Sequence, residues 1–232
     1  IAQHRDRPCF TCMDRTLTYG DIDVLATRFA AYLQQVARLR KGDRIALMLP
    51  NVLQYPVAIL GAFRAGLTIV NTNPMYTPRE LQHQLHDSGA RAILILENFA
   101  HTLAEVQHDV HLDTVIVTGV GDLLAFPKSL LVNFVLRHVK KQVPEYSLPG
   151  AVSLTEALSK GRYENLERVE LGHEDIAFLQ YTGGTTGVSK GAVLTHRNMV
   201  ANVLQSDAWM GPSLREASGP MILVTALPLY HI

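Results

Sequence analysis

From Thr18 onward the chain alternates between stretches with a helical period and short, unbroken apolar runs. The helical stretches predict a first helix after Thr18. Others are predicted after Asn51, from Pro78 to Gly89, over 99–108 and after His196. The apolar runs predict strands, which we place at 45–49, 67–70, 92–96, 115–117, 176–181, 192–194 and 221–226. Strands of near-continuous Ile, Leu and Val between amphipathic helices are typical of a parallel sheet. We therefore predict an α/β fold, a parallel sheet with helices on both faces.

Local signals predict where individual helices begin and end. Thr18 followed by Asp21 resembles a capping pair, and the apolar residues behind it share one helix face: Ile22, Leu25, Phe29, Leu33 and Val36. Thr77, Pro78 and Glu80 combine an N-cap, a proline at the first helical position and an acid at the third. Gly89 is expected to end that helix.

Residues 119–150 do not follow the alternation and are predicted to be an insert. Within it, 129–143 is an amphipathic helix with an apolar side (Leu130, Leu131, Phe134, Val135, Val139) and a polar side (Asn133, Arg137, Lys140, Lys141). This segment is too short to span a bilayer but is suited to lie in the interface plane of an anionic membrane. The alternative is a surface helix whose apolar side packs on the sheet.

Composition narrows the function classes. Hydrophobic residues make up 47% and charged residues 18%, and 21 Lys and Arg balance 21 Asp and Glu, so no basic surplus points to nucleic acid. Two cysteines are too few for a disulfide scaffold, which favours a reducing, intracellular compartment. The uncharged run 45–63 is interrupted by Pro50, Asn51 and Pro56, so we reject a spanning helix.

The strongest chemical signal is the run 181–191, Tyr-Thr-Gly-Gly-Thr-Thr-Gly-Val-Ser-Lys-Gly, between two predicted strands. Glycines let successive backbone amides approach one anion, and the hydroxyls and Lys190 add donors that suit phosphate oxygens. We expect a polyphosphate ligand with Mg²⁺. The order Ser189-Lys190-Gly191 departs from a Walker A loop, which excludes an ordinary P-loop NTPase. The alternative interpretation is a flexible Gly/Thr hairpin.

This run resembles the phosphate-binding signature of the adenylate-forming, AMP-binding superfamily, and more narrowly that of bacterial long-chain fatty-acyl-CoA synthetases. Pro228-Leu229-Tyr230-His231 resembles the next motif of that superfamily, and Thr195-His196-Arg197-Asn198 resembles its helix start. The narrower likeness rests on Leu179-Gln180, on 73–81 and on Val132-Asn133-Phe134. Ser189 stands where the family usually has proline, which leaves the position of Lys190 less rigid.

The resemblance implies an N-terminal part of the AMP-binding domain over 1–232, in an enzyme that turns a long-chain fatty acid, ATP and coenzyme A into acyl-CoA through an acyl-adenylate. It implies Lys190 and His231 as catalytic residues and Thr182 as a Mg²⁺ contact; for His231 the alternative is a core histidine at a strand end. The implied nucleotide-binding residues are Thr182, Gly183, Gly184, Thr185, Thr186, Gly187, Val188, Ser189, Lys190 and Gly191. The expected place is the cytoplasm, at the inner face of the cell membrane; a homodimer is left open.

The chain begins at Ile1 and ends at Ile232, and we expect it to be a fragment that lacks an acidic Mg²⁺ ligand, a ribose-binding Asp and a C-terminal lid with its lysine. The alternatives are a non-catalytic nucleotide-binding or membrane-recruitment module, and a synthetase for medium-chain or aryl acids.

Other constellations are weaker. Cys9 and Cys12 form a CxxC, but on a strand their odd spacing predicts opposite faces, so a shared metal is not expected. His83 with His86, and His108 with His111, have helical spacing for a shared ligand but are interpreted as solvated helix faces.

Overall fold

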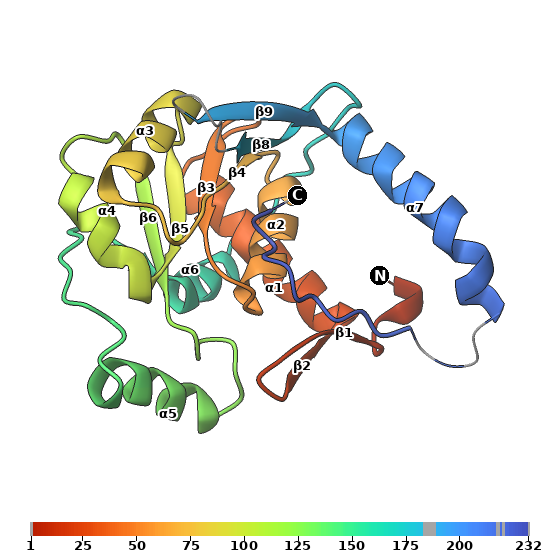
Figure 1. Cartoon of the computed structure of the whole chain (residues 1–232), viewed down its shortest axis with the longest axis horizontal. Coiled ribbons are helices and arrows are strands. Elements are labelled where there is room, and N and C mark those ends of the chain that lie inside the picture. The colour runs from red at the N-terminus through yellow and green to blue at the C-terminus, as the bar shows by residue number, and fades with distance from the viewer. Residues whose placement is uncertain (1, 183–188, 217–218, 220, 232) are drawn as a thin grey trace.

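A computed structural model describes residues 2–182, 189–216, 219 and 221–231. Within these ranges the main sheet has the order β7-β6-β5-β3-β4-β8-β9 (Figure 1). All neighbouring pairs are parallel except β8 and β9, which pair antiparallel. The strands are β3 (Arg44–Met48), β4 (Thr68–Asn71), β5 (Ala92–Leu96), β6 (Thr114–Thr118), β7 (Val152–Ser153), β8 (Ile176–Thr182) and β9 (Lys190–Thr195).

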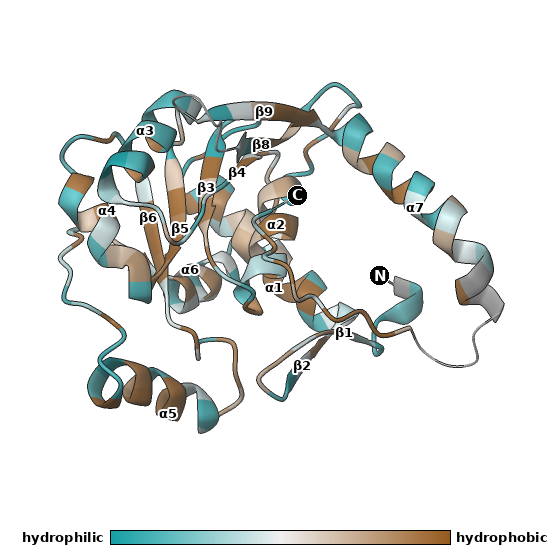
Figure 2. Cartoon of the chain, in the orientation of Figure 1, coloured by the Kyte–Doolittle hydropathy of each residue, from teal (hydrophilic) through white to brown (hydrophobic). Residues whose placement is uncertain are grey.

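Helices cover both faces of this sheet, which confirms the predicted α/β architecture. One face packs on α1 (Tyr19–Ala31) with its π-helical continuation (Tyr32–Val36), α2 (Gln54–Arg64) and α6 (Leu154–Gly161). The other face packs on α3 (Pro78–Ser88) and α4 (Ala100–Val106), which follows a 3-10 turn (Glu97–Phe99). The central strands are therefore buried on both sides, and Figure 2 shows them as mostly hydrophobic.

The predicted helix caps are confirmed. Thr18 and Asp21 form a reciprocal capping box at the start of α1, and Thr77 and Glu80 form another at the start of α3, with Pro78 in its first turn. Gly89 ends α3 with φ 60°, a left-handed conformation that a residue without a Cβ adopts at little cost. These contacts join residues three positions apart, which is why the sequence predicts them.

The insert contains α5 (Lys128–Phe134), which continues as a π-helical turn (Val135–Val139) and lies apart from the sheet in Figure 1. Its polar side faces the fold: Asn133 accepts from the amide of Gly121 at 2.7 Å and donates to Asp122 at 2.9 Å, and Arg137 pairs with the buried Glu97. The apolar residues Leu130, Leu131, Phe134 and Val139 are 56–65% exposed. The alternative of an apolar side packed on the sheet is therefore wrong for these residues.

Two predictions about the C-terminal part need correction. The strand expected near 192–194 is β9, and it runs antiparallel because a short hairpin returns the chain beside β8. The apolar run 221–226 forms no strand. Its backbone is instead contacted by the side chain of Asn51, which donates to the carbonyl of Thr225 at 3.0 Å. Between the two lies the long helix α7 (His196–Glu216), which projects from the sheet (Figure 1).

The N-terminal residues form a 3-10 turn (Ala2–His4) and a hairpin of β1 (Pro8–Cys12) and β2 (Arg15–Thr18). The expectation that Cys9 and Cys12 lie on opposite faces is wrong. Both are half-buried and pack on one cluster with Leu17, because the strand pairing is irregular between Pro8 and Phe10. Burial raises the pKa of both thiols, which disfavours the thiolate that redox chemistry or zinc would use.

None of the helices in the described ranges combines the length and apolar character that a bilayer span needs.

Candidate functional site

The ends of the Gly/Thr loop are fixed by the β8–β9 hairpin. Thr182 pairs with Lys190 and Tyr181 with Gly191, so β8 ends at Thr182 and the chain rejoins the sheet at Lys190, directly after Ser189. The intervening predicted residues, Gly183, Gly184, Thr185, Thr186, Gly187 and Val188, lie outside the described residues. As predicted, the loop starts at the carboxyl end of a strand that is parallel to its inner neighbour β4, the edge where ligands of such sheets bind.

Thr182 and Lys190 are directly opposite in an antiparallel pair, so their side chains point to the same side of the hairpin. Both residues are exposed to solvent. Gln180 lies two positions before Thr182 and therefore shares that side. The hairpin thus presents a hydroxyl and an ammonium group together, as the sequence analysis expected of a phosphate site.

The predicted motif 228–231 is connected to the same side of β8. The side-chain amide of Gln180 donates to the carbonyl of Tyr230 at 3.0 Å, one residue before His231. His231 itself is exposed, so the alternative of a core histidine is wrong. The structure therefore brings the segment that carries His231 to the strand that ends in Thr182.

A row of buried hydrogen bonds holds Gln180 in place. Its Oε1 accepts from Asn71 at 2.9 Å, and Asn71 Oδ1 accepts from the hydroxyl of Tyr55 at 2.7 Å. Tyr55 is fully buried, and burial raises the pKa of its phenol, so it remains a neutral donor. This row joins α2, β4 and β8 at the carboxyl edge. Sequence reasoning missed it because isolated Asn and Gln residues carry no spacing signal.

Asn51 provides a second attachment for the C-terminal segment. Its amide nitrogen donates to the carbonyls of Thr225 and Leu227, and its Oδ1 accepts from the amide of Leu229 at 2.8 Å. The apolar run that was predicted to be a strand is thus held by one side chain instead of a ladder. The sequence pattern marks Asn51 only as a polar interruption of an apolar run.

The two histidine pairs do not form shared ligand sites. His83 Nε2 lies 3.2 Å from the carbonyl of Ser189, whereas His86 Nε2 lies 2.6 Å from the carbonyl of Asp109. His108 and His111 follow the end of α4 and have no helical spacing. The interpretation of His83 as part of a solvated face is wrong, since it reaches the end of the loop.

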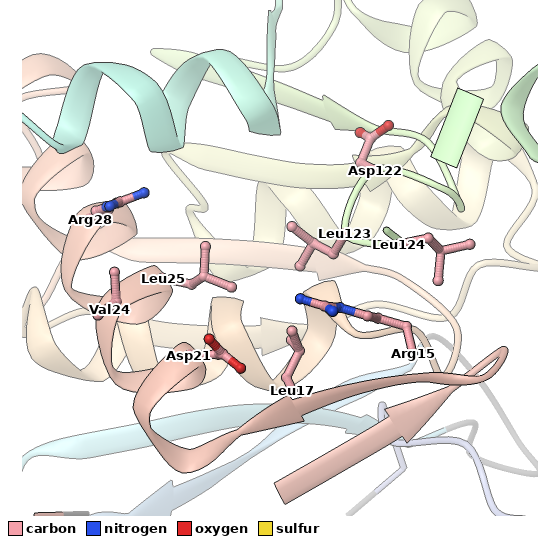
Figure 3. Close-up of a pocket in the computed structure, with 9 residues that line it drawn as sticks. All are labelled: Arg15, Leu17, Asp21, Val24, Leu25, Arg28, Asp122, Leu123 and Leu124. Carbon is pink, nitrogen blue, oxygen red and sulfur yellow. The ribbon is translucent and has the colours of Figure 1, made fainter. Parts of the chain in front are cut away.

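A separate hollow of about 390 Å³ lies between α1 and the 122–124 turn (Figure 3). Its charged lining residues are of both signs, Arg15 and Arg28 with Asp21 and Asp122, so it does not select an anion. Asp21 is also committed to the cap of α1. We assign this hollow no part in the site.

The hydroxyl of Thr182 is suited to bind the Mg²⁺ of a Mg²⁺–nucleotide complex. Thr182 places an exposed hydroxyl at the mouth of the loop, and Mg²⁺ in nucleotide sites takes few protein oxygens because phosphates and water supply the rest. Within the described ranges, no group of three or more His, Cys, Asp or Glu side chains forms a metal cluster. Thr182 is the residue of the described site that fits this role.

Comparison with known proteins agrees with this geometry. The profile of the family described as AMP-binding enzyme matches residues 1–232, so the chain belongs to the AMP-binding enzyme family. It is 54% identical over 232 residues to a long-chain-fatty-acid–CoA ligase of Escherichia coli O157:H7, and 51% identical to one of Haemophilus influenzae. Each match covers 100% of this chain and 41% of the relative, so the chain spans about two fifths of their length.

Solved structures agree at the level of the fold. A long-chain-fatty-acid-CoA ligase from Archaeoglobus fulgidus matches with a TM-score of 0.68 and 25% identity, over 97% of this chain and 38% of that one. A Rhodopseudomonas palustris structure titled as a long-chain-fatty-acid CoA ligase matches with a TM-score of 0.75 over 99% of this chain and 49% of its own, at 18% identity, which shows the fold alone.

Proposed function

We propose that the protein containing this chain activates long-chain fatty acids to acyl-CoA in two steps. The fatty-acid carboxylate attacks the α-phosphorus of ATP and displaces pyrophosphate, which gives an acyl-adenylate. The thiol of coenzyme A then attacks the acyl carbonyl and displaces AMP, losing its proton. Membership of the AMP-binding family and the identity to bacterial long-chain ligases support this proposal.

The observation that carries it is the gathering of Thr182, Lys190 and the 228–231 segment on one side of the β8–β9 hairpin. Residues 182–191 would hold the β- and γ-phosphates, Lys190 would stabilise charge that develops on them, and His231 would lie beside the fatty-acid carboxylate. Bound Mg²⁺, with Thr182 as one ligand, would neutralise phosphate charge. Positioning and charge stabilisation are the main demands of such a reaction.

Fatty-acid-dependent exchange of pyrophosphate into ATP tests the first step in the complete protein. Removal of one charged donor from a developing phosphate charge costs about 2–4 kcal/mol, so Lys190→Ala is expected to lower kcat/KM by roughly 30- to 1,000-fold. Lys160→Ala, which removes an exposed lysine on α6, is the matched control. Equal rates for the two variants would contradict the assignment of Lys190.

The same assay separates the alternatives. Exchange that depends on palmitate more than on octanoate or benzoate supports the long-chain acid over medium-chain and aryl acids. ATP binding without exchange for any of these acids would instead support a non-catalytic nucleotide-binding module.

We also propose that α5 contacts the inner, anionic face of the cell membrane from the cytoplasm. Its apolar side is exposed, and Lys140 and Lys141 follow at its end, where they are exposed as well. Apolar area and cations together favour anionic bilayers. The homodimer left open by the sequence stays a prediction, which sedimentation velocity of the complete protein would check.

A further inference from the structure

Helix α3 contacts both ends of the Gly/Thr loop from the side of the sheet opposite to Thr182 and Lys190. His83 Nε2 lies 3.2 Å from the carbonyl oxygen of Ser189, where the chain returns from the loop. The hydroxyl of Tyr181, where the chain leaves, donates to Asp87 Oδ2 at 2.5 Å. His83 and Asp87 are four residues apart, so they lie on one helix face. A single helix face thus contacts the two strands of the hairpin.

The Tyr181 contact is fixed by packing as well as by its hydrogen bond. The tyrosine is 5% exposed and belongs to the core cluster that α3 and α4 form with the sheet. Its ring lies so close to Gly191 that a Cβ there would be 3.0 Å from two ring carbons. Burial first, and then the hydrogen bond and charge of Asp87, raise the pKa of the phenol, so it stays a donor.

The His83 contact has a defined polarity. A carbonyl oxygen only accepts, so Nε2 of His83 must carry the hydrogen in this contact. Ser189 lacks the ring that fixes φ in proline, and it follows a glycine-rich run, a composition whose ordering has a high entropic cost. A bond to its carbonyl fixes the peptide unit that leads directly into Lys190.

Helix α3 is itself a rigid support. Its first turn is closed by the Thr77–Glu80 capping box, and the hydrogen bonds from Thr77 lower the pKa of Glu80, which keeps this carboxylate charged. Leu81 and Leu85 are buried in the core. Gln84 donates to the carbonyl of Asn71 at 2.9 Å in a buried contact at the end of β4. A support of this kind holds site residues in one geometry.

We propose that α3 braces the phosphate loop, with His83 as the positioning residue for Ser189 and Lys190, and Asp87 holding the other strand through Tyr181. This rests on the proposed function for the identity of the ligand, ATP. His83 and Asp87 act through the hairpin and touch no substrate. The brace fixes the backbone of Tyr181, Ser189 and Lys190 before ATP arrives, and therefore affects the affinity for ATP more than the chemistry of a bound complex.

The test compares His83→Leu and His83→Gln in the complete protein, since a glutamine amide is a donor and leucine is not. His86→Leu and His86→Gln are matched controls, because His86 also contacts a backbone carbonyl from α3 but at Asp109, away from the loop. One neutral hydrogen bond is worth roughly a three- to tenfold change in an equilibrium constant. We expect His83→Leu to raise the Kd of ATP, measured by calorimetry without fatty acid, and its KM in pyrophosphate exchange by about that factor.

His83→Gln and both His86 variants are expected to stay within about twofold of the parent, and kcat is expected to change less than KM in His83→Leu. Hydrogen exchange of the amides of residues 190–192 without ATP is a readout independent of activity. It is expected to quicken in His83→Leu and not in His86→Leu.

Equal effects of His83→Leu and His86→Leu on ATP affinity, or failure of His83→Gln to restore it, would overturn the brace. If His83→Leu does not fold, Tyr181→Phe tests the other contact and must raise the Kd of ATP for the brace to stand. Failure of the proposed function would be seen differently. The parent protein itself would then show no fatty-acid-dependent pyrophosphate exchange, whereas the differences between His83→Leu and His86→Leu in calorimetry and hydrogen exchange would remain.

Discussion

The side chain of Asn51 hydrogen-bonds the backbone of a segment in which the sequence predicted a strand. Its amide hydrogen-bonds the backbone of Thr225, Leu227 and Leu229, in a segment that forms no strand. All the polar atoms of this amide face the segment, so its orientation is defined by the donors and acceptors there. Hydrogen bonds from Asn51 and Gln180 thus hold the residues that lead to His231, together with the packing of Leu229 and Tyr230 on the core.

Substitutions of Asn51 distinguish its two functions. Asn51→Ala removes all three bonds, whereas Asn51→Asp keeps an acceptor for the Leu229 amide and loses both donors. We expect Asn51→Ala to lose the hydrogen-exchange protection of the Leu229 amide and Asn51→Asp to retain it. Each variant should lower the free energy of unfolding by about 0.5–1.5 kcal/mol per bond lost, since two of the bonds are exposed and the third is only part-buried. Loss of Leu229 protection in both variants would contradict the assignment of this bond.

At the scale of elements, the contact of α6 with α1 depends on the absence of a side chain. Gly161 is buried at the end of α6, and a Cβ there would lie 1.9 Å from the carbonyl oxygen of Arg28 and 3.1 Å from Tyr32 Cβ. The nearest atom belongs to the backbone of another helix, so it does not move aside as a flexible side chain would. The glycine therefore sets how closely the two helices approach.

Gly161→Ala is expected to destabilise the protein by about 1–3 kcal/mol, because the helices must separate to admit the methyl group. Urea denaturation of the complete protein measures this change. Gly172→Ala is the matched control, since a Cβ there would lie 3.7 Å from Asp175 Oδ2, an ordinary contact, and its amide can still donate to that oxygen. A similar loss of stability in both variants would contradict the close-approach argument.

At the scale of the whole molecule, α5 turns its polar side inward and its apolar side outward. The inward side is fixed by Asn133 and by the ion pair of Arg137 with Glu97, so Arg137 has a structural role. Charge reversal at Arg137 would place two carboxylates together at a buried position. Lys140 and Lys141 are the cations suited to test membrane contact without that effect.

We expect Lys140→Gln with Lys141→Gln to weaken binding of the complete protein to anionic vesicles by roughly 30-fold at low salt, at about 1 kcal/mol per cation. Replacement of Leu130, Leu131 and Phe134 by Gln should remove much of the remaining binding. Co-sedimentation measures both effects. The control removes two exposed cations elsewhere, by Lys160→Gln with Arg168→Gln. Equal binding by control and test variants would contradict the proposed surface.

The sequence alone determined what depends on neighbours a few residues apart. The period of apolar residues predicted the type of helices α1 to α4 and of the long strands of the main sheet, but not α6 or β7, and it left open whether the apolar side of α5 is exposed. The two capping boxes and Gly89 were predicted because their bonds join residues within one turn. The glycines, hydroxyls and Lys190 of 181–191 indicated a phosphate site, since that chemistry lies within a single loop.

Only the tertiary structure decided which distant groups complete the site. Asn51 and Leu229 are 178 positions apart, and His83 and Ser189 are 106 apart, so no local pattern could pair them. The antiparallel direction of β9, the absence of a strand at 221–226 and the outward apolar side of α5 likewise depend on contacts with distant parts of the chain. Hydrophobic pattern specifies that a residue is to be buried or paired, but the partner is chosen by packing of the whole chain, because burial energy is non-directional and hydrogen bonds go to whatever backbone lies within reach.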